Sequence, residues 1–534
     1  MRAKYKLTAA AVFVLIALLA CRAALTPPTQ PAPAATAGTP TAAGLAVTAP
    51  VSTAELTPPL PTQDVSAGLN AALLPDARSD APDPAESALY NISLEIDDSY
   101  LRFDGQLQAS VPNNSAGEWQ VIYFRLFPNA GKTYGNGRLQ VDRVLLEGES
   151  LQTRLSVEDT VLEIQLPEPL RPGERITLAM EFHGQVAEDF GSQERPGYGI
   201  YNYSEGVLAM SGWYPILAVY DDQGWHLDPV SWLGDSVYSE MAYYSVEVTA
   251  PPELVLAATG TILLQEIFAD HARYQIETGP VRDFFLALSP DFKLLSREVS
   301  GTVVNAYYQT GDEKAASQAL QVAVDALQVF NRRFGAYPYA ELDIVQAPMR
   351  IALGVEYPGI VMVATDLYRD PEQYVFTTAV AHEVAHQWWY NLVGNNVFAE
   401  PWLDEGLATY STAVYYQEVS GQAAYLAYSD TWQKRYERLL QESDDDLPTR
   451  DLAYFEQPGK AQIYGAVVYI KSALFFKALR EEIGERAFFE GLRSYYEAHH
   501  YGVAAGEDLL QAFEVAAGQS LQDLYQQWLY TADD

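Results

Sequence analysis

The pattern of hydrophobic and polar residues divides most of the chain into two parts. Between about residues 87 and 290, short runs alternate with a period of two, as in Asn91–Ile96, Val161–Leu166 and Tyr244–Val248. Successive side chains of a strand point to opposite faces of a sheet, so such runs predict strands when turn residues like Arg171-Pro172-Gly173 separate them. Residues 87–290 are therefore expected to form an N-terminal, mostly antiparallel β domain.

The second pattern covers residues 291–534. A strand is expected at Val303–Tyr308, then an amphipathic helix from Asp312 to Phe334, then strands at Leu342–Val345 and around Glu356. Helical periods dominate the rest of this part. The predicted fold class is therefore a β domain followed by an α+β domain.

The first 86 residues follow neither pattern. Residues 1–6 are basic, and Leu7–Ala20 is a run of 14 apolar or small residues, which is too short to span a bilayer comfortably and is typical of a signal-peptide core. The run leads into Leu18-Leu19-Ala20-Cys21, which resembles a bacterial lipoprotein box. Residues 1–21 are predicted to be a lipoprotein signal peptide with lipid attached to Cys21. An ordinary signal peptide with an incidental cysteine is the alternative.

Residues 22–86 are rich in Ala, Pro and Thr and show no helical or strand period. A segment of this composition cannot bury a core, so we expect a disordered, flexible linker between the lipid and the folded part. The predicted location is extracytoplasmic, with the protein lipid-anchored to a bacterial membrane through Cys21.

The net charge of −37, from 33 basic and 70 acidic residues, makes nucleic acid and anionic lipid surfaces poor partners. Solubility outside the cell is the simpler interpretation of this charge, and a preference for cationic peptides is the bolder one. Because Cys21 is the only cysteine, the chain has no intramolecular disulfide, and any metal site must use nitrogen and oxygen ligands.

Candidate chemistry is concentrated between residues 379 and 410. His382, Glu383 and His386 form an H-E-x-x-H motif, and Glu405 follows after 18 intervening residues. Residues four apart lie on one face of a helix, so both imidazoles can reach one metal ion while Glu383 lies beside it. Two histidines and one carboxylate leave a position for water, as in a catalytic zinc site. The alternative is a core helix with two hydrogen-bonded histidines.

Flanking residues predict the two helices that this site needs. The segment Asp370-Pro371-Glu372-Gln373 has the order of an N-cap, a first-turn proline and a capping-box partner, and Gly394 is expected to close the segment. Pro401 can begin a second helix that carries Glu405 in its first turns, and Gly421 can end it.

This stretch resembles peptidase family M1, the zinc aminopeptidases of the gluzincin group. The family pattern is H-E-x-x-H, eighteen residues and then W-L-N-E-G, and Trp402-Leu403-Asp404-Glu405-Gly406 is similar to it, with Asp404 in place of asparagine. The resemblance implies a thermolysin-like catalytic domain over residues 291–534 in a form that lacks the C-terminal domains of larger members. It also implies one Zn²⁺ per chain, with the ligands His382, His386 and Glu405 and the general base Glu383.

The resemblance adds residues outside this stretch. The family uses a tyrosine of a Y-x-K-G-A-type helix as donor to the oxyanion, and Tyr469-Ile470-Lys471-Ser472-Ala473 is similar, with Tyr464 as the competing choice. The family's G-x-M-E-N segment binds the substrate amine and corresponds to Leu353-Gly354-Val355-Glu356-Tyr357. This implies that Glu356 binds the amine and that Gly354 contributes its backbone. A solvent-facing glutamate on an edge strand is the alternative for Glu356.

The resulting expectation is a zinc metallopeptidase that removes N-terminal residues from peptides. An endo-acting or broader peptidase is one alternative, and a non-catalytic surface binding protein on a peptidase fold is another. Peptides are the expected partners. The acidic run Asp444-Asp445-Asp446 lacks the spacing and glycine of a calcium loop and is expected to be a solvated loop.

Overall fold

The computed structural model describes residues 65–191, 197–234, 237–443 and 445–531. The chain divides into two compact units, residues 1–61 and 62–534, and the described residues belong to the second unit. The predicted signal peptide and Cys21 therefore lie outside the described residues. Within the described ranges, no helix combines the length and the apolar character needed to cross a membrane.

The predicted linker is wrong from residue 65 onward. Helix α2 (Val65–Ala72) and a 3-10 turn (Pro75–Ala77) precede the first strand. Leu73 is buried and pairs through an isolated β-bridge with Tyr339, and the Leu74 amide donates to the Pro338 carbonyl at 2.8 Å. Leu73 and Leu74 do not stand out in the average composition of residues 22–86. They bury apolar area against the folded unit, and this burial orders the segment.

The β-rich part contains three main sheets, and most of their strand pairs are antiparallel. The eight-stranded sheet has the order β17-β18-β15-β1-β2-β8-β4-β5, and its one parallel pair joins β1 to β15. Its strands are β1 (Ala88–Ile96), β2 (Arg102–Pro112), β4 (Arg138–Leu146), β5 (Glu149–Ser150), β8 (Arg175–Gln185), β15 (Ala242–Ala250), β17 (Thr261–Ile267) and β18 (Ala272–Glu277). The alternating burial of β1 and β2 matches the period of two in their sequences.

Two smaller sheets and a short hairpin complete this part. A four-stranded sheet has the order β12-β3-β7-β6, with β3 (Trp119–Arg125), β6 (Thr153–Ser156), β7 (Val161–Leu170) and β12 (Ile216–Leu217). A five-stranded sheet has the order β16-β19-β11-β10-β9, with β9 (Ala187–Glu188), β10 (Tyr201–Ser204), β11 (Val207–Met210), β16 (Val255–Ala258) and β19 (Leu286–Ser289). Strands β13 (Tyr220–Asp221) and β14 (Gly224–Trp225) pair with each other.

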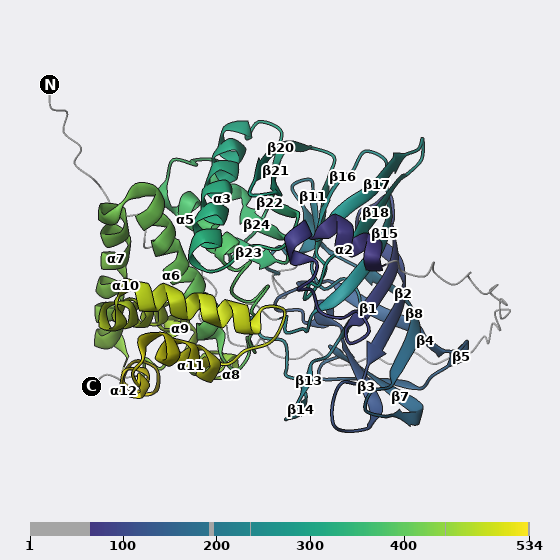
Figure 1. Cartoon of the computed structure of the whole chain (residues 1–534). Helices are drawn as coiled ribbons and strands as arrows, with labels where there is room; N and C mark the ends of the chain where they lie inside the picture. Colours follow the sequence, from purple (N-terminus) through teal and green to yellow (C-terminus); the bar gives the residue numbers. More distant parts are fainter. Residues whose placement is uncertain (1–64, 192–196, 235–236, 444, 532–534) are drawn as a thin grey trace, which may run out of the picture. The chain divides into compact units, whose positions relative to one another are not determined.

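The α+β part begins with a mixed sheet in the order β20-β21-β22-β24-β23. Its strands are β20 (Phe292–Val299), β21 (Thr302–Gln309), β22 (Glu341–Ala347), β23 (Gly354–Tyr357) and β24 (Ile360–Ala364). Strand β23 lies at one edge, and helix α3 (Glu313–Arg333) packs beside the sheet (Figure 1). Strands β21, β22 and β23 and helix α3 agree with the expected strands and the expected amphipathic helix, whereas β20 and β24 were not predicted.

Helices form the rest of this part (Figure 1). The longer ones are α5 (Tyr374–Ala385), α6 (Pro401–Ser420), α7 (Gln422–Glu442), α10 (Ser472–His499) and α11 (Gly506–Ala517), and the short ones are α4 (Thr365–Tyr368), α8 (Leu452–Phe455), α9 (Ala461–Tyr464) and α12 (Gln522–Tyr525). Segments Gly465–Lys471 and Gln526–Tyr530 are π-helical. The order of a β-rich part followed by an α+β part confirms the predicted fold class.

A buried arginine connects the β-rich part to the loop after α5. Arg282 donates from Nε to the Tyr390 carbonyl at 2.7 Å and from Nη1 to the Ser239 carbonyl at 3.0 Å. A Cβ at Gly394 would come within 2.2 Å of the guanidinium carbon, so only glycine fits this close approach. These contacts fix the chain direction just beyond the H-E-x-x-H motif.

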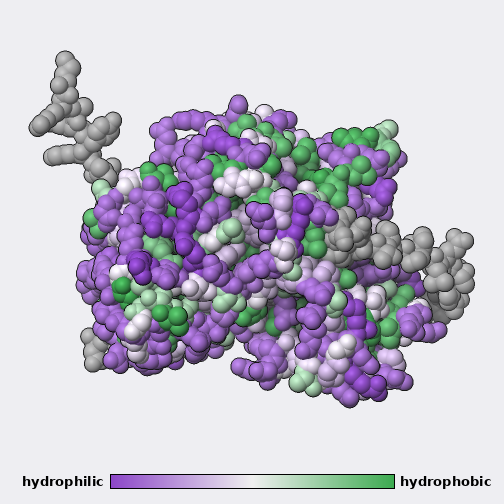
Figure 2. Space-filling view, viewed as in Figure 1, coloured by the Kyte–Doolittle hydropathy of each residue, from purple (hydrophilic) through white to green (hydrophobic). Residues whose placement is uncertain are grey.

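The face seen in Figure 2 is mostly hydrophilic, as the high content of acidic residues predicts. Exposed apolar side chains do occur on the outer strand β17 and the turn after it, including Leu263, Leu264, Ile267 and Phe268. These four side chains lie close together in the sequence, at an edge of the eight-stranded sheet.

Candidate active site

Helix α5 carries the H-E-x-x-H motif, but its ends differ from the prediction. It begins at Tyr374 rather than after Asp370, because Gln373 has an extended backbone with ψ of 140° and its side chain donates to Asp370 at 2.7 Å within a turn. It ends at Ala385 rather than near Gly394. Tyr390 has a φ of +87°, and its carbonyl accepts from Arg282, so tertiary contacts turn the chain early.

Helix α6 follows the prediction at both ends. Pro401 is in the first turn and Gly421 is the C-cap, with a φ of +87° that favours glycine. Glu405 lies in the second turn and is buried. The sequence therefore predicts this helix correctly, since its boundaries are set by local residues.

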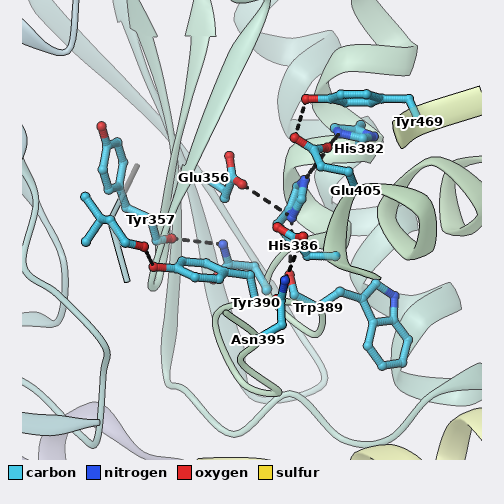
Figure 3. Close-up of polar contacts among 12 residues, drawn as sticks. Glu356, Tyr357, His382, His386, Trp389, Tyr390, Asn395, Glu405 and Tyr469 are labelled. Atoms are coloured by element: carbon cyan, nitrogen blue, oxygen red, sulfur yellow. Dashed lines mark hydrogen bonds and ion pairs between the residues drawn. The ribbon is translucent and has the colours of Figure 1, made fainter. Parts of the chain in front are cut away.

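The two helices bring the three predicted metal ligands together (Figure 3). His382 Nε2 lies 3.2 Å from His386 Nε2 and 3.2 Å from Glu405 Oε2, and His386 Nε2 lies 3.4 Å from the same oxygen. Tetrahedral ligand atoms about 2.0 Å from a zinc ion would be about 3.3 Å apart. The spacing and the donor types therefore fit a zinc ion.

The charges of these groups also suit a dication. Burial opposes ionisation of Glu405, but hydrogen bonds from His382 and His386 hold its pKa at about 2. Burial lowers the pKa of His382 and favours the neutral imidazole that can bind a metal. Burial opposes protonation of His386, but the negative charges of Glu356 and Glu405 raise its pKa well above the usual value, so a metal would bind this imidazole in exchange for a proton. One carboxylate and two neutral imidazoles would then leave a bound Zn²⁺ with a net positive charge.

Glu383 is buried next to the metal ligands and contacts strand β23. A Cβ at Gly354 would come within 2.4 Å of Glu383 Cγ and Oε1, so glycine lets the strand approach this side chain. Burial, followed by the negative charges of Glu356 and Glu405, raises the pKa of Glu383. A raised pKa suits a group that takes up a proton and then releases it. The role of Gly354 is therefore to let the backbone of β23 approach the Glu383 side chain.

Glu356 lies on β23 and points toward the metal ligands rather than to solvent (Figure 3). Its side chain is 8% exposed, and Oε1 lies 3.4 Å from His386 Nδ1. The solvent-facing alternative is therefore wrong, although β23 is indeed an edge strand. Glu356 faces the Nδ1 side of His386, whereas the proposed metal ligands His382 and Glu405 face its Nε2.

Asp404 is a buried acidic residue that the sequence marked only as a departure from the family pattern. Its Oδ1 accepts a hydrogen bond from Asn395 Nδ2 at 3.0 Å, and Asn395 also donates to the Glu400 carbonyl at 3.1 Å. Burial, followed by repulsion from Glu405, raises the pKa of Asp404 to about 8. Glu356, His386 and Asp404 form a second group of close donor atoms. The spacing of these residues in the sequence gave no signal for this group.

Tyr469 belongs to the π-helical segment Gly465–Lys471, and its hydroxyl donates to Glu405 Oε1 (Figure 3). Its ring centroid lies 6.0 Å from that of His382. The competing Tyr464 ring is 5.8 Å from the Tyr469 ring, and its hydroxyl lies against Gly234 in the β-rich part. Of the two tyrosines, the structure places Tyr469 at the metal ligands.

The fold thus places the two histidines of an H-E-x-x-H motif and a distant glutamate, Glu405, where together they can bind one metal ion. Residues 318–528 match the family model described as the peptidase family M1 domain. This part of the chain is similar to the peptidase family M1 domain.

Similar proteins carry aminopeptidase and metallopeptidase names. The chain is 26% identical over 305 residues to aminopeptidase 2 of Candida albicans, covering 53% of this chain and 32% of that protein. It is 27% identical over 245 residues to aminopeptidase N of Streptomyces lividans, covering 41% of this chain and 26% of that protein. The chain thus spans about a third of the length of the curated relatives it matches.

Solved structures share the fold over most of the chain. The crystal structure of an M1 zinc metallopeptidase from Deinococcus radiodurans matches with a TM-score of 0.61 and 19% identity, over 84% of this chain and 96% of that chain. A mutant of that enzyme bound to a Tyr-Ser-Ala substrate matches with a TM-score of 0.60. The match extends over both the β-rich and the α+β parts, since it covers more than the family domain alone.

Proposed function

We propose that this protein is a zinc-dependent peptidase that removes N-terminal residues from peptides. The observation that carries the proposal is the convergence of His382, His386 and Glu405, with Glu383 beside them. The match of residues 318–528 to the peptidase family M1 domain supports it. The zinc ion would lower the pKa of a water molecule and polarise the scissile carbonyl.

Glu383 and Tyr469 have different roles in the proposed hydrolysis. Glu383 takes the proton of the attacking water on its carboxylate and delivers it to the leaving nitrogen, for which its buried position and raised pKa are suited. The Tyr469 hydroxyl stands as a neutral donor beside the metal ligands, where negative charge develops on the carbonyl oxygen. Burial raises the pKa of Tyr469, so the phenol keeps its proton.

Glu356 supplies a negative charge close to the same centre. A buried carboxylate at this point would attract the free ammonium group of a peptide substrate through charge-assisted hydrogen bonds. This favours removal of N-terminal residues over cleavage inside a peptide. Recognition of the peptide terminus by Glu356 is part of the proposal.

A panel of aminoacyl fluorogenic substrates tests this function. Wild-type protein with zinc should hydrolyse substrates with a free amine, and Glu383→Gln should lower kcat by roughly 10²- to 10⁴-fold while zinc content stays unchanged. Glu372→Gln is a matched control, since Glu372 is exposed and pairs with Lys314 outside the site. Equal cleavage of free and acetylated peptides would indicate an endopeptidase. Zinc-loaded protein that cleaves no peptide would indicate a binding protein.

We also propose that the chain is exported and anchored through a lipid on Cys21. The basic start, the short apolar run and the residues before Cys21 support this. Incorporation of a labelled fatty acid in a bacterial host should be lost in Cys21→Ser, and the variant should leave the membrane fraction. Equal labelling of both proteins would contradict lipid attachment at this residue.

A further inference from the structure

Lys471, two residues after Tyr469 in the π-helical segment, forms a buried ion pair with Asp446. Lys471 Nζ is 2.7 Å from Asp446 Oδ2, and the two side chains are 1% and 0% exposed. The Tyr436 hydroxyl donates to the same Asp446 oxygen, and its ring centroid is 5.6 Å from Lys471 Nζ. The expectation that Asp444–Asp446 forms a solvated loop is therefore wrong for Asp446, because the side chain folds inward to meet a buried cation.

The geometry of the π-helical segment makes this pair relevant to the site. Residues two apart on a helical turn point in roughly opposite directions. The Tyr469 side chain accordingly reaches Glu405, while Lys471 reaches Asp446 on the other side. Rotation of the segment about its axis would move both side chains together. Fixing Lys471 therefore fixes the direction of Tyr469.

The same segment is also held at its C-terminal end. Gly406, the residue after Glu405, packs so closely on Ser472 that a Cβ on Gly406 would lie 2.5 Å from Ser472 Cβ. This contact sets how near the segment comes to α6 but does not by itself fix its rotation. π-Helical turns are rare and are frequently found at functional sites, where they shift side chains from their ordinary α-helical register.

We propose that the buried Lys471–Asp446 pair, with Tyr436, is a positioning device that holds the Tyr469 hydroxyl at the metal ligands. A buried ion pair is a costly way to fill space, because both groups lose their hydration. It is directional, however, and can select one register of packed helices where apolar residues would allow several. The inference rests on the proposed function, in which Tyr469 acts on the substrate carbonyl.

The test is a double-mutant cycle between Lys471→Met and Tyr469→Phe. Lys471→Met alone should lower kcat by about tenfold to a hundredfold with little change in KM, because misplacement of a catalytic group by about 1 Å has effects of this size. In the Tyr469→Phe background the same substitution should cost less than about twofold, since the hydroxyl it positions is absent. Equal losses in both backgrounds would show that the pair only supports the fold and would overturn the proposal.

Control variants distinguish a loss of kcat caused by misplacement of Tyr469 from a loss caused by unfolding. Lys477 lies on α10 in a partly exposed pair with Glu481, and Lys477→Met should leave kcat unchanged. If Lys471→Met fails to fold, Asp446→Asn combined with Lys471→Met removes both charges, and Tyr436→Phe removes one hydroxyl. Each should lower kcat in the same Tyr469-dependent manner, and the absence of any loss in a folded variant contradicts the proposal.

A second readout does not depend on activity. Fluorine NMR of 3-fluorotyrosine placed at position 469 should show a shifted or split resonance in Asp446→Asn/Lys471→Met and an unchanged one in Lys477→Met. An unmoved resonance in the charge-free variant would overturn the positioning role. This readout separates the two proposals, because an inactive wild type would refute the peptidase function while the resonance would still report the role of Lys471.

Discussion

The metal centre and the residues that would handle the substrate are built in different ways. His382, His386 and Glu405 come from two consecutive helices, α5 and α6. Glu356 comes from the edge strand β23, and Tyr469 from a π-helical segment 64 residues beyond Glu405. Helical spacing aligns His382 with His386, and packing of α5 on the next helix, α6, adds Glu405. Contacts between segments more distant in the sequence place Glu356 and Tyr469.

This difference predicts different consequences of substitution. Loss of a donor atom from the centre should release the metal, because among the described residues three protein ligands converge there. Changes around Glu356 and Tyr469 should leave the metal bound and should alter turnover or selectivity.

Glu405→Ala should reduce zinc affinity by more than about a hundredfold and abolish peptide hydrolysis with it, since even outer partners of metal ligands have effects of 10- to 100-fold. Zinc content after dialysis, measured by elemental analysis, checks this. Glu418→Ala on the same helix, in a surface pair with Arg332 and Arg333, is the matched control and should keep its zinc. Full zinc occupancy in Glu405→Ala would contradict the assignment of Glu405 as a metal ligand.

Gly354→Ala should lower kcat by about a hundredfold while zinc stays bound. The added Cβ would collide with Glu383, and either the base or strand β23 must move. Kinetics and zinc content of the same preparation measure the two effects. Gly117→Ala, where the added carbon meets only Tyr220 at 3.4 Å, should change neither. A wild-type kcat in Gly354→Ala would argue against the placement of Glu383.

Glu356→Ala should lower kcat/KM by about 10- to 100-fold for substrates with a free amine, the value of a lost charge-assisted hydrogen bond. Acetylated peptides should be affected far less. Parallel assays with both substrate types, together with zinc analysis, provide the measurement. Equal losses for both types, accompanied by weaker zinc binding, would instead assign Glu356 to orienting His386 through Nδ1.

Asp283→Asn should have the smallest effect on function and should act on stability. Asp283 is buried, and burial, followed by the negative charge of Glu356, raises its pKa to about 7. The folded state therefore holds this proton more tightly than the unfolded state, so the group destabilises the fold increasingly as the pH rises from about 4 to about 7. The cost above pH 7 corresponds to about 4 kcal/mol at most.

The variant removes this pH dependence. The Tm of Asp283→Asn relative to wild type should rise by a few degrees between pH 4.5 and pH 8, as thermal unfolding at the two pH values would show. A difference in Tm that is the same at both pH values would mean that Asp283 is ionised in the folded protein.

The parts of the site that local residues determine could be predicted from the sequence. The spacing of His382 and His386 on one helical face and the proline and glycine at the ends of α6 are such features. The early end of α5 could not be predicted, because Arg282 from the β-rich part turns the chain at Tyr390. The burial of Asp446 could not be predicted either, because its partner Lys471 is 25 residues away in the sequence.

The order of a β-rich part followed by an α+β part could be predicted from the periods of hydrophobic and polar residues, but the start of the folded unit could not. The few leucines near Leu73 are too sparse to reveal an ordered helix within an Ala- and Pro-rich segment. Their order depends on contacts with Tyr339 and Pro338, which lie more than 260 residues later in the sequence.

The most direct test of the central claim is a crystal structure of the zinc-loaded protein with anomalous data at the zinc edge. We expect a single zinc peak about 2.0–2.2 Å from His382 Nε2, His386 Nε2 and the Glu405 carboxylate. A zinc ion on the other side of His386, bound by Nδ1 with Glu356 and Asp404, would contradict the proposed site.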